Sequence, residues 1–127
     1  MEPTFNIAIC GGGNLAHAVI ASIGSCNPHF KINVLSRRPE VWDKQIVAKT
    51  EGTPWAYKGD MIGKINLVSN KGKDVVSDAD IILVCSPAHT KNEILMEIRD
   101  HVKPGALIGS VFGQGAFDWQ AQHVFGD

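Results

Sequence analysis

The feature that most constrains the fold is a run of glycines that follows a short apolar segment. The segment "FNIAIC" (5–10) predicts a buried strand, and "GGGNLAHA" (11–18) follows it directly. Residues 14–24 carry apolar side chains at helical spacing and end at a glycine, which predicts a helix. A strand that passes through a glycine turn into a helix is the start of a βαβ unit.

Strand and helix patterns alternate along the rest of the chain. Further strands are expected at 31–36, in the later part of 61–69, at 80–86 and at 106–112. Further helices are expected at 39–50, around 74–79, at 87–102 and at 116–125. A hairpin excursion with its first arm at 54–58 is expected before the fourth strand. The alternation predicts an α/β fold: a Rossmann-type, doubly wound parallel sheet in a single three-layer domain spanning residues 1–127.

Composition excludes several classes of protein. The chain has 127 residues, enough for one domain, and its 12 Lys and Arg are offset by 13 Asp and Glu. We therefore expect neither a nucleic acid nor a membrane as partner, and no apolar stretch approaches the roughly 18 residues of a membrane span. The three cysteines form no C-x-x-C pattern, so no metal site and no disulfide framework is indicated. A cytoplasmic location is expected.

The glycine run fits the dinucleotide fingerprint G-x-G-x-x-A at Gly11, Gly13 and Ala16. The first glycine permits the tight turn, the second lets the backbone approach a pyrophosphate, and Ala16 keeps the helix close to the sheet. The helix N-terminus adds free N–H groups and a partial positive charge. Asn14 either donates to the pyrophosphate or caps the helix, and Leu15 is expected beside the cofactor. A purely structural glycine turn is the alternative.

The end of the second strand indicates which dinucleotide binds. An NAD site usually carries Asp or Glu about 20 residues past the fingerprint, but Ser36 occupies that position and Arg37 and Arg38 follow it. Two guanidinium groups at the start of a helix are unfavourable unless an anion offsets them, and the 2′-phosphate of NADP is such an anion. NADP is therefore the expected cofactor, with NAD possible. Solvated surface charges are the alternative.

The other strand ends offer contacts for the nicotinamide half. Ser86 can hydrogen-bond a cofactor, Pro87 ends the fourth strand, and Gln114 follows the fifth strand in a glycine-containing loop that alternatively only needs unusual dihedral angles. His17 is expected to pack or face solvent. His89 is expected to face solvent or to start a helix, with a contact to the nicotinamide or the substrate as the alternative. No nucleophile–base–acid arrangement is present in the sequence, so no catalytic residue is assigned to this chain.

Four stretches together resemble the N-terminal NAD(P)-binding domain of the octopine (opine) dehydrogenase family. They are "GGGNLAH", "VLSRRPEVW", "SDADIILVCSPAH" and "VKPGALIGSVFGQGAFDWQAQHVFGD". The resemblance implies NAD(P)H-dependent reductive condensation of an amino acid with a 2-oxo acid. It also implies a longer, two-domain enzyme whose second domain supplies the catalytic histidine and binds both substrates, so this chain alone should be inactive.

Two other interpretations remain open from the sequence. The "DADIILVCSPA" stretch is similar to glycerol-3-phosphate dehydrogenases and ketopantoate reductases. A stand-alone NAD(P)-binding regulatory module is the alternative from outside the enzymes. An apolar face suited to a second domain is expected in either enzyme, and a homodimer through that face is one consequence.

Overall fold

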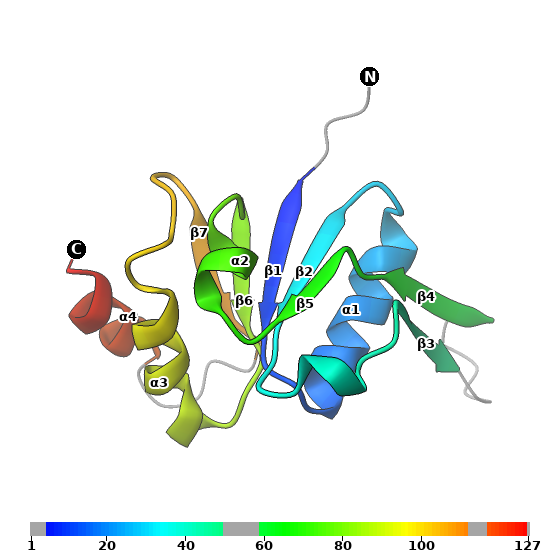
Figure 1. Cartoon of the computed structure of the whole chain (residues 1–127), viewed down its shortest axis with the longest axis horizontal. Helices are drawn as coiled ribbons and strands as arrows, with labels where there is room; N and C mark the ends of the chain where they lie inside the picture. Colours follow the sequence, from blue (N-terminus) through cyan, green and yellow to red (C-terminus); the bar gives the residue numbers. More distant parts are fainter. Residues whose placement is uncertain (1–4, 50–58, 112–116, 127) are drawn as a thin grey trace.

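The computed structural model describes residues 5–49, 59–111 and 117–126. Five parallel strands form one sheet in the order β5-β2-β1-β6-β7 (Figure 1). They are β1 (Asn6–Cys10), β2 (Lys31–Leu35), β5 (Leu67–Ser69), β6 (Ile81–Val84) and β7 (Leu107–Ser110). The first strand lies in the middle, and the chain builds out to one edge before it returns to build the other. This is the predicted Rossmann-type, doubly wound fold.

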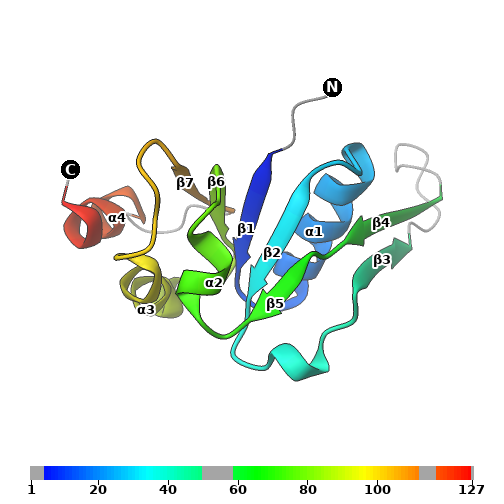
Figure 2. The ribbon, with the colours of Figure 1, turned by 45° about the horizontal axis from the view of Figure 1, so that its top comes forward.

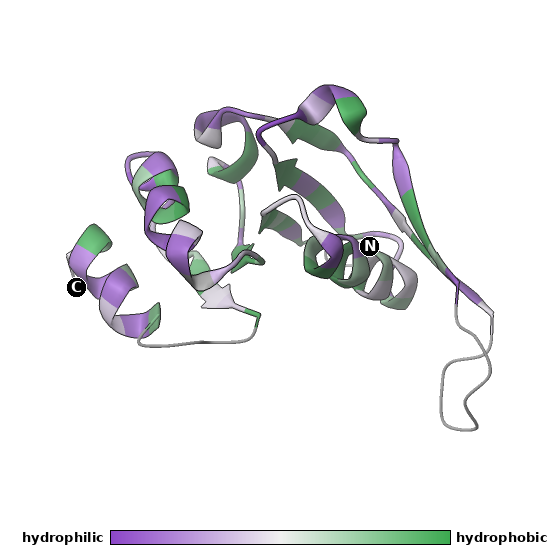
Figure 3. Ribbon diagram, turned by 90° about the horizontal axis from the view of Figure 1, so that it is seen from below, coloured by the Kyte–Doolittle hydropathy of each residue, from purple (hydrophilic) through white to green (hydrophobic). Residues whose placement is uncertain are grey.

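Helices cover both faces of the sheet, as the strand and helix alternation predicted. They are α1 (Asn14–Cys26), α2 (Gly72–Val76), α3 (Ala88–Ile98) and α4 (Phe117–Phe125). Figure 3 looks onto the carboxyl ends of the strands and shows α1 on one side and α2 and α3 on the other. The result is three layers with a core on each side of the sheet.

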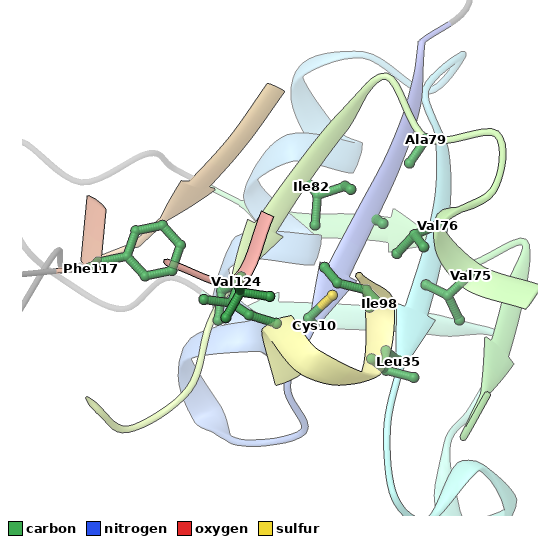
Figure 4. Packing of buried hydrophobic residues seen from close by; sticks show 12 residues of the cluster. Cys10, Leu35, Val75, Val76, Ala79, Ile82, Ile98, Phe117 and Val124 are labelled. Carbon is green, nitrogen blue, oxygen red and sulfur yellow. The ribbon is translucent and has the colours of Figure 1, made fainter. Parts of the chain in front are cut away.

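Strand β1 supplies both cores because its side chains alternate between the faces. Ile7 and Ile9 pack with α1, where Ile20 is fully buried. Ala8 and Cys10 belong to the cluster on the other face, among residues of α2, α3 and α4. Figure 4 shows Cys10 in this cluster. These four of the five β1 side chains are at most 3% exposed, so the end of β1 is a rigid platform for the loop that follows.

The prediction of a helix at 39–50 is wrong. A single 3-10 turn (Pro39–Val41) is followed by β3 (Gln45–Lys49), which pairs antiparallel with β4 (Asp60–Lys64). Ile46 and Ala48 are half-buried while their neighbours in β3 are exposed, which is the period of two of a strand. The hairpin is therefore present, but its first arm is 45–49. The expected first arm, 54–58, lies outside the described residues.

The hairpin lies alongside α1, on the same side of the sheet (Figure 2). Its docking depends on two glycines, because Gly24 of α1 and Gly63 of β4 are both buried and approach each other backbone to backbone. The later part of the excursion rejoins the main sheet as β5, as predicted. The first arm of the hairpin, β3, thus lies in the part of the chain that was predicted to be a second long helix.

No helix within residues 5–49, 59–111 and 117–126 has both the length and the apolar character that crossing a membrane requires.

An ion pair fastens the amino end of the sheet. The Lys103 ammonium lies 2.6 Å from Asp80 Oδ1, and the backbone N–H of Asn6 donates to Asp80 Oδ2 at 2.9 Å. The hydrogen bond from Asn6 and then the Lys103 partner lower the pKa of Asp80 below its ordinary 3.8. The charged form of Asp80 is therefore the form that the fold favours.

This arrangement predicts a specific pH dependence of stability. A carboxyl whose pKa is lowered by folding stabilises the fold above its unfolded pKa, and that contribution is lost as pH falls through the folded value. Asp80→Asn should therefore flatten the acid limb of a plot of Tm against pH between about 2 and 5. Thermal melts of both proteins across this range measure it, and parallel acid limbs would contradict the assignment.

Candidate functional site

Gly11 is required by the fold itself. Its φ is +137°, in the region that favours glycine, and its N–H donates to the Leu35 carbonyl at 3.0 Å. A Cβ at this position would collide with the backbone carbonyl of Cys85. The chain therefore passes between the ends of β2 and β6 at a point where only a glycine fits.

Gly13 is different, because nothing in the described protein needs a glycine there. Its φ of −89° suits any residue, and a Cβ would meet no atom within 4 Å. Gly13 is the N-cap of α1, which has no side-chain cap and no acidic residue in its first turn. The first turn of α1 therefore has no side-chain cap, and Gly13, Asn14 and Leu15 line a hollow, which is the arrangement that binds anions at helix N-termini.

The residues after Gly13 take separate roles. Asn14 is the first residue of α1, exposed and not a cap, so the capping interpretation does not hold. Leu15 is half-buried beside the glycine loop. Ala16 is 0% exposed and packs α1 against the sheet, so it shapes the loop from beneath.

Two hollows flank the glycine loop at the carboxyl end of the sheet. The larger, here the β2-end groove, has a volume of about 660 Å³, and the smaller, the β6-end groove, about 340 Å³. Both are lined by Gly12, Ser86 and Pro87, so they meet at the loop. The β2-end groove adds residues that include Leu35, Ser36, Arg37, Arg38, Trp42, Thr90, Glu93 and Glu97, and the β6-end groove adds Gly13, Asn14, Leu15, Cys85 and Val111.

Ser36 lies at the floor of the β2-end groove and is held by Trp42. Its hydroxyl oxygen accepts hydrogen bonds from the Trp42 indole N–H at 2.9 Å and the Arg38 backbone N–H at 3.3 Å. The Trp42 ring stacks on His17 at 4.4 Å, and His17 Nδ1 donates to the Gly13 carbonyl at 2.9 Å. His17 therefore packs, as expected. Trp42 was not predicted, because the sequence pattern placed it within a helix.

Both arginines that follow Ser36 line the groove, and each has a carboxylate partner. Arg37 Nη2 lies 2.8 Å from Glu93 Oε2 on α3, and Arg38 Nε lies 3.6 Å from Glu40 Oε1. The side chains of both arginines are at least 75% exposed. The sequence did not indicate Glu93, because it is 56 positions from Arg37 and only the fold brings it there.

Ser86 carries an unpartnered polar group between the two grooves. Within the described ranges, its hydroxyl oxygen is the buried side-chain polar atom without a hydrogen-bond partner. Such a group is costly unless a ligand or water completes it. Pro87 follows it at the rim of both grooves, and His89 is exposed. Gln114 lies outside the described residues.

The two cysteines near the loop are not nucleophiles. Burial raises the pKa of Cys10 to about 12 and that of Cys85 to about 11. Both thiols are therefore protonated at neutral pH, and a protonated thiol does not attack as a thiolate does. Their role is to fill the sheet below the glycine loop.

These features define a class of site. A glycine loop without side chains, an uncapped helix N-terminus, an unpartnered serine hydroxyl and a groove on each side are the features typical of the nucleotide-binding edge of Rossmann-type domains. The family model described as "NADP oxidoreductase coenzyme F420-dependent" matches residues 6–112, and the chain belongs to that family.

The curated proteins to which the chain is similar include tauropine, octopine and opine dehydrogenases. Tauropine dehydrogenase of Arabella iricolor is 32% identical over 95% of this chain and 32% of its own length. Octopine dehydrogenase of Pecten maximus is 24% identical over 98% of this chain and 33% of its own length. The resemblance inferred from the sequence motifs is thereby confirmed. The chain spans about a third of the length of these curated relatives.

Solved structures show the same fold. Octopine dehydrogenase with NADH and L-arginine superposes with a TM-score of 0.84 at 19% identity, over 97% of this chain and 32% of that chain. Yersinopine dehydrogenase with NADP+ bound superposes with a TM-score of 0.69 at 17% identity, over 88% of this chain and 30% of that chain.

Proposed function

We propose that the chain is the NAD(P)H-binding domain of an opine-type dehydrogenase, with residues 1–127 forming the cofactor domain of a longer, two-domain enzyme. The observation that carries the proposal is the open space above Gly13 at an uncapped helix N-terminus. A glycine that the protein's own packing does not need is explained by a ligand that approaches its backbone. Similarity to tauropine and octopine dehydrogenases over nearly the whole chain supports the same class.

The two grooves suit the two halves of a dinucleotide. The pyrophosphate would lie over Gly12 and Gly13 at the N-terminus of α1, whose partial positive charge favours it. The adenosine half would occupy the β2-end groove beside Ser36, and the nicotinamide half the β6-end groove, where the Ser86 hydroxyl lacks a partner. Leu15, Pro87 and Gln114 complete the proposed contacts.

The reaction we propose is the reductive condensation of an amino acid with a 2-oxo acid. When bound, the nicotinamide would supply the hydride that reduces the imine formed between the two substrates. Residues of this chain bind and orient the dinucleotide, while the packed β1 and Ala16 keep the loop in place. We propose that substrate binding and proton transfer belong to the second domain, so that this chain alone binds cofactor without turnover.

NADP is the proposed preferred cofactor. Ser36 leaves the end of β2 without a carboxylate, and Arg37 and Arg38 both line the β2-end groove. A hydrogen bond to a charged group contributes roughly 1.5 to 3 kcal/mol, so one good contact to a 2′-phosphate favours NADPH by about tenfold. Structures of octopine dehydrogenase contain NADH and a structure of yersinopine dehydrogenase contains NADP+, which supports a nicotinamide dinucleotide of either kind.

Replacing both arginines should therefore change cofactor preference more than overall affinity. Arg37→Ala with Arg38→Ala is expected to lower the ratio of NADPH to NADH affinity by about tenfold, with NADH binding nearly unchanged. Titrations followed by cofactor fluorescence measure both affinities. Lys31→Ala with Lys64→Ala removes the same charge away from the groove and serves as the control. An unchanged ratio in the arginine variant would contradict the NADP preference.

The proposed reaction can be tested on the full-length protein. Full-length protein should oxidise NADPH when an amino acid and a 2-oxo acid are both present, and not when either is omitted. Cofactor binding without oxidation under any such pairing would favour the regulatory-module interpretation. We also propose a cytoplasmic location, which the free thiols of Cys10, Cys26 and Cys85 support.

A further inference from the structure

The β2-end groove contains a carboxylate that the fold brings to the arginines from another layer. Glu93 lies on α3 and pairs with Arg37, which follows β2, at 2.8 Å. Both side chains line the same groove and both are largely exposed, at 67% and 82%. The pair therefore crosses the part of the groove in which we place the adenosine ribose.

A negative charge at this position acts differently on the two nicotinamide dinucleotides. The 2′-phosphate of NADPH carries close to two negative charges, and a carboxylate beside its arginine repels it and competes for the guanidinium. The ribose 2′-hydroxyl of NADH is a hydrogen-bond donor, for which a carboxylate is a good acceptor. The same side chain thus opposes one cofactor and accommodates the other.

We propose that Glu93 is a specificity-determining residue that sets the balance between NADPH and NADH by holding Arg37. The inference rests on the proposed function, because it assumes that the ribose lies in the β2-end groove. In this arrangement Glu93 supplies from α3 the carboxylate that is absent from the end of β2. NADPH binds at the expense of the Arg37–Glu93 pair, whereas NADH leaves it in place.

The two other carboxylates near the groove are held differently. Glu97, one turn further along α3, accepts a hydrogen bond from the Gly72 backbone N–H at 3.1 Å. Glu40 is a close sequence neighbour of Arg38, and its oxygen is 3.6 Å from that guanidinium. Glu93 alone among these three bonds to Arg37 in the described structure. Glu97 therefore offers a matched control on the same helix and in the same groove.

The test compares Glu93→Gln and Glu97→Gln in titrations with NADPH and NADH. Glu93→Gln keeps the size of the side chain and removes its charge, and it should tighten NADPH binding by about fivefold, the upper range for an exposed ion pair. NADH affinity should stay equal or fall. Glu97→Gln should leave the ratio of the two affinities within about twofold, since it is not bonded to an arginine.

A second comparison separates this inference from the proposed function. In an Arg37→Ala background, Glu93→Gln should lose most of its effect, because the partner through which it acts is gone. If Arg37→Ala lowers NADPH affinity but Glu93→Gln does not raise it, the role of Glu93 is refuted while the cofactor site stands. If neither dinucleotide binds the parent protein, the proposed function itself fails. An equal gain from Glu97→Gln would show a general charge effect and overturn the assignment.

Discussion

Gly13→Val should abolish most dinucleotide binding while leaving the protein folded. A valine side chain at this position has open space around it and an ordinary φ, so the free energy of unfolding should change by no more than about 1 kcal/mol. The branched side chain would occupy the space that we assign to the pyrophosphate, so affinity should fall by about a hundredfold. Cofactor titration and thermal melting of the same preparation measure the two effects.

Gly11→Val is the matched comparison for this prediction. It changes the same residue type two positions earlier, but there φ is +137° and the added Cβ meets the Cys85 carbonyl group, with the carbonyl carbon at 2.9 Å. This variant should lose both stability and binding. If Gly13→Val binds like the parent, the space above Gly13 is not the pyrophosphate site.

Gly63→Ala should be among the most destabilising single changes in the hairpin. A Cβ at Gly63 would lie 2.7 Å from the Ile20 carbonyl carbon and against its oxygen, and the backbone of a packed helix cannot yield to it. We expect a loss of about 3 kcal/mol in the free energy of unfolding, because β4 must move away from α1. Chemical denaturation followed by circular dichroism measures the change.

Gly109→Ala provides the control for the hairpin. Gly109 is also a strand glycine, but its added Cβ would be 3.7 Å from a Leu83 side-chain carbon, an ordinary contact. That variant should stay within about 1 kcal/mol of the parent. An equal loss of unfolding free energy in both variants would mean that replacing any strand glycine is destabilising. The close contact between α1 and β4 would then not explain the effect at Gly63.

The main sheet could be predicted because its strands are short, apolar and separated by helical patterns. Each strand β1, β2, β6 and β7 lies within the range expected for it, and the return of the chain into the sheet at β5 was also expected. The glycine loop was predictable for the same reason: its spacing and its place between strand and helix are both local features.

The segment 39–50 shows where local pattern fails. Its apolar residues suit a helix by spacing, but β4 packs closely on α1 where Gly63 meets Gly24, and β3 pairs with β4. Ile46 and Ala48 then face inward with the period of a strand. The contact joins residues about 40 positions apart, so the sequence of 39–50 alone does not contain the information that makes residues 45–49 a strand.

The β2-end groove shows the same limit for the site. Ser36, Arg37 and Arg38 were found because they follow a strand. Trp42 and Glu93 were missed, since a stacking contact with His17 and an ion pair with Arg37 exist only after folding. The sequence therefore identified the residues at strand ends, whereas the structure was needed to identify the residues that contact and position them.

A side-by-side titration of NADPH and NADH onto the purified protein by calorimetry shows whether the glycine loop binds a dinucleotide. We expect both dinucleotides to bind saturably at one site per chain, with NADPH the tighter of the two. Absence of heat and of any thermal stabilisation with either dinucleotide would contradict this expectation, because the glycine loop would then be a structural turn and the two grooves would have another purpose.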